Sequence, residues 1–193
     1  MPVTINGDGS ITGLAAGGLP SSALTGAIPS STLPAGTVIQ CVTDTTTART
    51  DNNGNTYVAI NGLSVTMTPR AANSKFYAIF EGHFYVDYGG SGSNSAHGIG
   101  YNIYKDGTRF TTSPNDSGGG ENSERPYDWY NDGAHRTVAR LMKTGQGTFG
   151  STSAATFTVK FKAYYANSQY TVKLNENNSD QTQAQLTVME IAV

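Results

Sequence analysis

Hydrophobic and polar residues alternate along most of the chain after residue 36, with the two-residue period of half-buried β-strands. The longest alternating run covers residues 74–86, and another covers residues 156–165. The residues expected to face the core in these two runs are Phe76, Ala78, Phe80, Phe84, Val86, Phe157, Val159, Phe161, Ala163 and Tyr165. In the second run the polar face carries Thr158, Lys160 and Lys162. Both runs therefore predict strands with one buried side.

Shorter β-type runs follow the same pattern and are separated by turn residues. They cover residues 37–43, 56–60, 63–68, 98–105, 137–142, 170–174 and 184–193. Turn signals between the runs include Asn53-Gly54, Asn61-Gly62, Asp106-Gly107 and Asp132-Gly133. No segment shows the period of an amphipathic helix. The pattern predicts an all-β protein, an antiparallel β-sandwich of jelly-roll type.

The last strand-like run is apolar on both of its faces. Leu186 and Val188 lie on one face, and Met189, Ile191 and Val193 lie on the other. A two-sided strand at the end of a chain predicts a subunit interface formed by these five residues. The alternative is a central strand that is covered on both sides within one subunit.

The first 36 residues have a different texture and contain a short repeat. Leu19-Pro-Ser-Ser-Ala-Leu24 returns nine residues later as Ile28-Pro-Ser-Ser-Thr-Leu33. Prolines and glycines interrupt regular structure here, and residues 13–36 carry no charge. The large apolar side chains within residues 13–36 are those of Leu14, Leu19, Leu24, Ile28 and Leu33. We expect residues 1–36 to form an extended docking arm and residues 37–193 to form the β-sandwich head.

Composition narrows the class of protein. Charged residues make up 13% of the chain and the formal net charge is −2, so most of the surface is polar but uncharged. This balance is typical of β-rich proteins of particle or extracellular surfaces, and it argues against nucleic-acid binding, which depends on clustered Lys and Arg. No basic residue precedes Arg49 and no long apolar run occurs. We therefore expect neither a secretory signal nor membrane insertion.

Three sequence features that could indicate a redox, nucleotide-binding or calcium-binding site are better explained by structural roles. Cys41 is the only cysteine, and its place in a strand-like run predicts a buried thiol. Gly145-Gln-Gly-Thr-Phe-Gly150 has the letters of a dinucleotide fingerprint, but a strand follows it where that fingerprint needs a helix. Asp51-Asn-Asn-Gly-Asn55 resembles the start of a calcium loop, yet its glycine comes too early, which favours a plain turn.

Glu81 and His83 share one face of a strand, and a hydrogen-bonded pair is favoured over a metal site. No nucleophile elbow or pair of catalytic carboxylates is apparent in the sequence. We therefore expect no enzymatic activity, no cofactor and no metal.

The segment 111–133 is long for a loop, and long loops in compact domains are often functional. It ends in a group of aromatic and polar side chains that could stack on a sugar and bind its hydroxyls, or contact a protein. These residues are Arg125, Tyr127, Asp128, Trp129 and Tyr130. The alternative is that the aromatic rings fold back and cap the sandwich.

Several segments carry a resemblance that covers most of the chain. They are Leu33-Pro-Ala-Gly-Thr-Val-Ile-Gln-Cys-Val42, Gly62-Leu-Ser-Val-Thr-Met-Thr-Pro69, Ala72-Asn-Ser-Lys-Phe76, Ser153-Ala-Ala-Thr-Phe-Thr-Val-Lys-Phe161, Leu186-Thr-Val-Met-Glu-Ile-Ala192 and the leader Thr4-Ile-Asn-Gly-Asp-Gly-Ser-Ile-Thr-Gly-Leu14. Together they resemble virion structural proteins of tailed bacteriophages, many of them marine, and in particular the head domains of tail-fibre-like or capsid-decorating appendages.

The resemblance implies a short, non-enzymatic appendage on the virion surface. We expect a homotrimer, because phage fibre heads usually close by rotational symmetry and the two-sided last strand needs an apolar partner. The arm would dock on other virion proteins of the capsid, neck or tail. The alternative function is host attachment, in which the head binds a host receptor or surface glycan.

Overall fold

The computed structural model describes residues 4–5, 11–12, 33–88, 99–110, 123–124, 135–163, 170–175 and 182–193. The chain divides into two compact units, Met1–Leu33 and Pro34–Val193. In the first unit the described residues form an antiparallel pair of short strands, β1 (Thr4–Ile5) and β2 (Ile11–Thr12). The extended docking arm stays a prediction, because most of residues 1–36 lie outside the described ranges.

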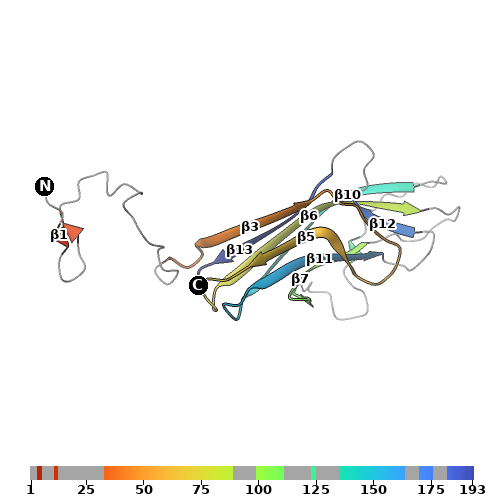
Figure 1. Ribbon diagram of the computed structural model, residues 1–193. Coiled ribbons are helices and arrows are strands. Elements are labelled where there is room, and N and C mark those ends of the chain that lie inside the picture. Colours follow the sequence, from red (N-terminus) through yellow and green to blue (C-terminus); the bar gives the residue numbers. More distant parts are fainter. Residues whose placement is uncertain are drawn as a thin grey trace. The chain divides into compact units, whose positions relative to one another are not determined.

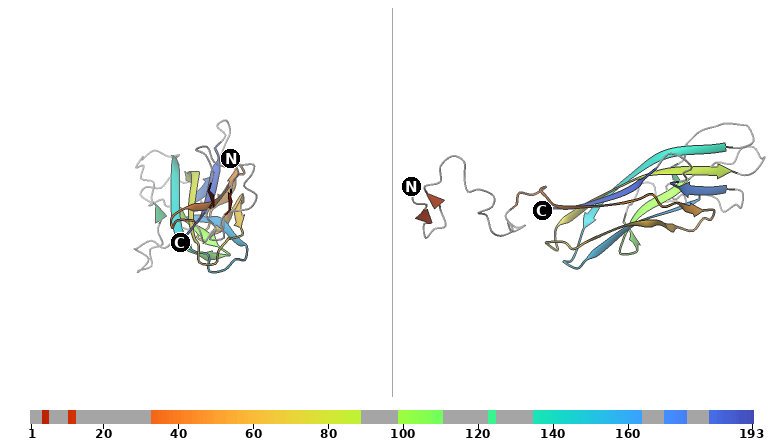
Figure 2. Two further views of the ribbon diagram at one scale, coloured as in Figure 1. Left: turned by 90° about the vertical axis from the view of Figure 1, so that its left-hand side faces the viewer. Right: turned by 45° about the horizontal axis from the view of Figure 1, so that its top comes forward.

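The second unit contains a six-stranded antiparallel sheet (Figures 1 and 2). Its strands are β3 (Val38–Thr46), β4 (Thr50–Asn52), β6 (Lys75–Tyr88), β10 (His135–Thr148), β12 (Tyr170–Leu174) and β13 (Ala184–Ile191). The long strand β6 organises the sheet. It pairs along its whole length with β10, while β13 pairs with its first half and β12 with its second half. Strand β3 pairs with β13, and β4 pairs with β12.

The second sheet of this unit has five strands. They are β5 (Val58–Met67), β7 (Ile99–Lys105), β8 (Thr108–Arg109), β9 (Ser123–Glu124) and β11 (Ala155–Ala163). The order is β5-β11-β7-β8, and β9 also pairs with β7. Between β7 and β8 the turn residues Asp106 and Gly107 have φ of 50° and 78°, so they form the tight hairpin turn that an Asp-Gly pair favours.

The two sheets pack against each other over an aromatic core, as a β-sandwich. Phe76, Phe80 and Phe84 of β6 meet Phe157 and Phe161 of β11, and all five are buried. The rings of Phe76 and Phe157 and those of Phe84 and Phe161 pack edge to face, with centroids 5.0 and 5.3 Å apart. The all-β, antiparallel sandwich is therefore confirmed. Its jelly-roll subtype stays a prediction.

The glycine-rich segment 145–150 belongs to this packing. Gly145 and Gly147 lie within β10, so no helix begins here and the fingerprint letters have no phosphate-binding geometry. A Cβ atom at Gly147 would lie 2.6 Å from the Phe76 ring. Glycine therefore allows the ring to lie against the backbone of β10, which is a packing role.

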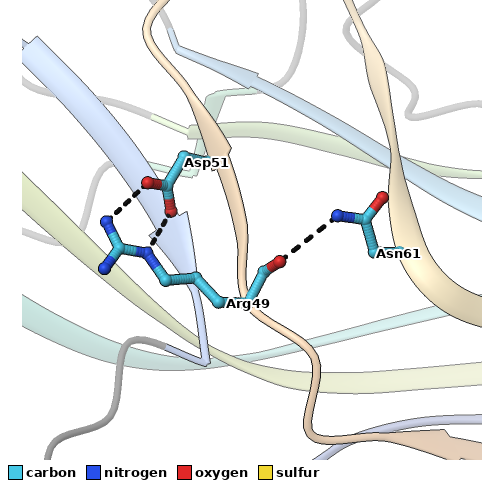
Figure 3. Close-up of polar contacts among 3 residues, drawn as sticks. All are labelled: Arg49, Asp51 and Asn61. Carbon is cyan, nitrogen blue, oxygen red and sulfur yellow. Dashed lines mark hydrogen bonds and ion pairs between the residues drawn. The ribbon is translucent and has the colours of Figure 1, made fainter.

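The corner between β3, β4 and β5 is held by polar contacts (Figure 3). Arg49 donates two hydrogen bonds to the Asp51 carboxylate, of 2.6 and 2.5 Å. The Asn61 side chain donates to the Arg49 carbonyl, and the Asn61 N–H donates to the Thr50 hydroxyl. Asn52 turns back to accept from the Gly54 N–H at 2.9 Å. The predicted turn is therefore confirmed for residues 53–55 alone, because Asp51 and Asn52 belong to β4, where Asp51 is the ion-pair partner of Arg49.

The prediction of a buried Cys41 is wrong, since its thiol is exposed. Cys41 lies on β3, next to Met189 of β13, and Val42 turns toward the core instead. In a short run such as Ile39-Gln40-Cys41-Val42, apolar residues stand at both alternate positions, so the sequence does not reveal which of them face inward. In the described part of this unit no second layer covers the outer side of the sheet, so Cys41 is exposed there.

Candidate functional site

Two of the three predicted sites fall largely outside the described residues. All of the aromatic loop does, namely Arg125, Tyr127, Asp128, Trp129 and Tyr130. Of the arm residues, Leu33 is described, whereas Leu14, Leu19, Leu24 and Ile28 are not. The recognition role of the loop and the docking role of the arm stay predictions.

The third predicted site, on the C-terminal strand, is described in full. Strand β13 lies between β3 and β6, and Leu186 and Val188 are completely buried in the chain's own core. The interface prediction is therefore corrected for these two residues, because a side chain in the core cannot contact a second subunit. On the outer face Met189 and Ile191 are half-buried, and Val193 at the chain end is 52% exposed.

The outer face of the six-stranded sheet has a central area without charge, which we call the neutral face. In one row across the strands Cys41, Met189, Tyr77 and Gln146 are neighbours. In the next row Thr43, Thr187, Ile79 and Thr144 are neighbours. The hydroxyls of Thr43 and Thr187 are hydrogen-bonded at 2.9 Å. Uncharged and partly apolar side chains thus cover four adjacent strands.

Exposed hydrophobic residues gather around the neutral face. Among the described residues the large hydrophobic side chains that are most exposed are those of Val38, Met142 and Val193. Val38 pairs with Ile191, Met142 pairs with Glu81, and Val193 follows β13 at its end. These three exposed side chains therefore belong to the six-stranded sheet or, for Val193, directly follow one of its strands.

The outer face of the five-stranded sheet has a different chemistry, and we call its cluster the tyrosine-lysine face. The cluster consists of Tyr57, Asn102, Tyr104, Arg109, Lys160 and Lys162. The Lys160 ammonium lies 4.6 Å from the centre of the Tyr104 ring, and the Lys162 ammonium lies 5.1 Å from that of Tyr57. The two tyrosine rings meet edge to face, with centroids 6.1 Å apart.

The buried side-chain amide of Asn102 holds the Tyr57 hydroxyl of this cluster by a hydrogen bond. Asn102 is 2% exposed, and its side chain donates a hydrogen bond of 3.0 Å to the Tyr57 hydroxyl. Gly100 makes room above the same strand, since a Cβ atom there would lie 3.0 Å from the Tyr57 hydroxyl and 3.2 Å from the Lys162 side chain. Tyr57 and Lys162 can therefore lie close against β7.

The environment of the cluster raises the pKa of both phenols, which are protonated near neutral pH. Burial raises the pKa of Tyr57, and the neighbouring Tyr104 adds to this rise, while Asn102 and Arg109 oppose it. Burial also raises the pKa of Tyr104, and the positive charge of Arg109 opposes that change. Both hydroxyl groups thus remain neutral donors beside three cationic side chains.

The sequence analysis missed this cluster, although it placed Lys160 and Lys162 on the outer side of their strand. The missing information was the pairing of strands. Lys160 of β11 pairs with Asn102, Thr158 pairs with Tyr104, and Tyr104 pairs with Arg109 of β8. The available sequence signal was Tyr104, an aromatic residue at an outward-facing position of this strand, and in the structure all six residues from Ile99 to Tyr104 are buried.

The predicted pair of Glu81 and His83 is replaced by a different partner. Glu81 forms an ion pair with Arg140 of the adjacent strand β10. Within the described ranges no group of three His, Cys, Asp or Glu side chains is arranged to hold a metal ion. The described residues also include no helix that is long and apolar enough to cross a membrane.

Glu190 is a further residue whose environment the sequence did not reveal. Its carboxylate is completely buried at the core side of β13. It accepts hydrogen bonds from the Ser74 hydroxyl at 2.5 Å, from the Gln40 side chain at 2.6 Å and from the Arg70 N–H at 2.9 Å. The Ala71 N–H lies 3.3 Å away. Glu190 therefore anchors the connection between β5 and β6 to the last strand.

Comparison with known proteins found neither a protein-family model nor a curated protein that matches this chain.

Proposed function

We propose that this chain is a non-enzymatic structural protein on the surface of a tailed-bacteriophage particle. Its β-sandwich forms the head of a short trimeric appendage of the tail-fibre or capsid-decoration kind, and its N-terminal arm docks on a capsid, neck or tail protein. The observation that carries the proposal is the neutral face, around which the exposed hydrophobic residues of the described sandwich gather. The resemblance of the sequence segments to virion proteins supports the location.

The neutral face suits contact with further copies of the same chain. A rotation axis brings the same residues of each subunit close together, so any charge near the axis would meet its own copies. Tyr77, Ile79 and Met189 carry no charge and are half-buried in the single chain. Completing the burial of such half-buried side chains stabilises an assembly by up to about 1 kcal/mol each, roughly half of the value for burying a fully exposed one.

A non-enzymatic role agrees with how the chain uses its buried carboxylate. Glu190 already accepts hydrogen bonds from several groups of its own chain, and it lies where no substrate reaches it. A fully buried and saturated carboxylate of this kind holds a loop in place. It is a poor general acid or base, because that role needs contact with a substrate proton.

Light scattering of the purified protein at micromolar concentration tests the trimer. Thr187→Glu places a charge at the centre of the neutral face, and we expect it to give a folded monomer. Thr66→Glu is the matched control, because Thr66 also lies on an outer sheet face and its hydroxyl meets that of Thr156 at 3.1 Å. A wild-type monomer, or two variants that both remain trimeric, would contradict the neutral face as the subunit interface.

Host attachment is a second candidate function, and the tyrosine-lysine face is the observation that favours it. Three cations, two phenols and a buried amide on one sheet face are groups that recognise polar ligands. The purified protein should then compete with intact particles for host cells. Unchanged adsorption of particles in the presence of excess protein would contradict this function.

A further inference from the structure

The tyrosine-lysine face combines positive charge with a regular spacing. Lys160 and Lys162 are two residues apart on β11, and both point to the outer side, which places their backbones roughly 7 Å apart along the strand. Arg109 of β8 adds a third cation beside Tyr104. A chain-like ligand with repeated negative charge fits such a row better than a single small anion does.

Neutral donors and acceptors surround these cations. The Tyr57 and Tyr104 phenols are protonated at neutral pH, since the ordinary pKa of a phenol is about 10 and burial raises the pKa of each further. The same outer face continues over exposed Ser64 and Thr66 and half-buried Thr156 and Thr158. Hydroxyl groups of this kind exchange hydrogen bonds with the hydroxyls of sugars, and nucleic-acid phosphates would require a larger cluster of cations.

The cluster is also held in place before any ligand binds. Asn102 fixes the Tyr57 hydroxyl, and the tyrosine rings hold the two lysine ammonium groups above them. Side chains that are already ordered lose less entropy on binding, so more of the interaction energy appears as affinity. Gly100 contributes by leaving space for Tyr57 and Lys162.

We propose that the tyrosine-lysine face binds an acidic polysaccharide, with its lysines and Arg109 contacting sugar carboxylates and its tyrosine and threonine hydroxyls contacting sugar hydroxyls. This inference rests on host attachment, the second candidate function, and names the class of its ligand. It does not depend on the trimer, because every residue of the face comes from one chain.

Calorimetric titration of the full chain with polygalacturonate oligomers at fixed ionic strength tests the proposal. Lys160→Gln should weaken binding about tenfold, since it removes one charge-assisted contact. Arg70→Gln is the matched control for net charge. The Arg70 side chain is exposed before β6, and only its backbone N–H contacts Glu190. This control should bind within about twofold of the wild type.

Two further ligands separate the chemistry of the site from general attraction to anions. Neutral dextran should not bind, and inorganic polyphosphate should bind at least tenfold more weakly than polygalacturonate. Absent binding of polygalacturonate, equal losses in Lys160→Gln and Arg70→Gln, or equal affinity for polyphosphate would each overturn the proposal. Each chain of the Thr187→Glu variant should bind the ligand with the same affinity as a wild-type chain. Failure of the trimer would therefore leave ligand binding unchanged, and failure of this site would leave the oligomeric state unchanged.

Discussion

The two outer faces of the sandwich differ in chemistry although both arise from strands of alternating pattern. The neutral face has Tyr77, Ile79 and Met189 at its centre, and its nearest charges form the Glu81–Arg140 ion pair or belong to Lys75. The tyrosine-lysine face has cations above aromatic rings. This difference is why we propose a different partner for each face, further copies of the chain for the neutral face and an acidic polysaccharide for the tyrosine-lysine face.

The largest expected effect comes from the buried carboxylate of Glu190, which lies on the core side of the strand that carries Met189 of the neutral face. Glu190→Ala removes the acceptor of the Arg70 N–H, and it leaves the Ser74 hydroxyl and the Gln40 amide with only the Ala71 and Thr68 carbonyls as acceptors. We expect the free energy of unfolding to fall by about 3–5 kcal/mol, since buried donors lose their partner. Urea denaturation measures this loss.

The control for this variant lies on the same strand. Gln185→Ala removes an exposed side chain of β13 and should change the free energy of unfolding by less than about 0.5 kcal/mol. If Glu190→Ala costs less than about 1 kcal/mol, the carboxylate does not anchor the connection between β5 and β6.

The dependence of stability on alkaline pH tests the two tyrosines of the tyrosine-lysine face. Because the pKa of Tyr57 and of Tyr104 is raised in the folded chain, the folded state holds these protons more tightly than the unfolded state does. Their contribution to stability is therefore complete below about pH 10, the ordinary pKa of tyrosine, and is lost as the pH rises through the folded pKa values. Melting temperatures measured on both sides of pH 10 should show this fall.

Tyr104→Phe identifies the source of that fall. It removes one of the two phenols whose pKa is raised, so the decrease in melting temperature above about pH 10 should become smaller than in the wild type. Tyr77→Phe, which removes a phenol from the neutral face, is the control for the loss of one hydroxyl group. An alkaline decrease that is the same in all three proteins would argue against the raised pKa values.

The smallest effect is a change in the reactivity of one thiol. Cys41 is exposed in the single chain and lies in the neutral face beside Met189. In a trimer that uses this face, a maleimide reagent should label Cys41 several times more slowly than in the monomeric Thr187→Glu variant. Mass spectrometry over time measures both rates, and equal rates would place Cys41 outside the subunit contact.

The alternation of residues predicted the strands of the core, but it did not predict how the outer faces are composed. Phe76, Phe80, Phe157 and Phe161 lie where the two-residue period put them, because that period is a property of the extended backbone itself. Cys41 was placed on the wrong side because a short run of apolar residues has no clear phase. Glu190 was overlooked because its partners Gln40 and Ser74 are far from it in sequence.

The sequence by itself determined the class of fold, the turns and one buried side for each long strand, since these depend on near neighbours and on backbone geometry. Only the tertiary structure decided which strands lie side by side. It also decided which of the two faces of the last strand is the core, namely that of Leu186 and Val188, and it brought Tyr57, Tyr104 and Lys160 together from three strands or their flanks. Contacts between strands distant in sequence depend on register, and one residue of shift would exchange the two faces of a strand.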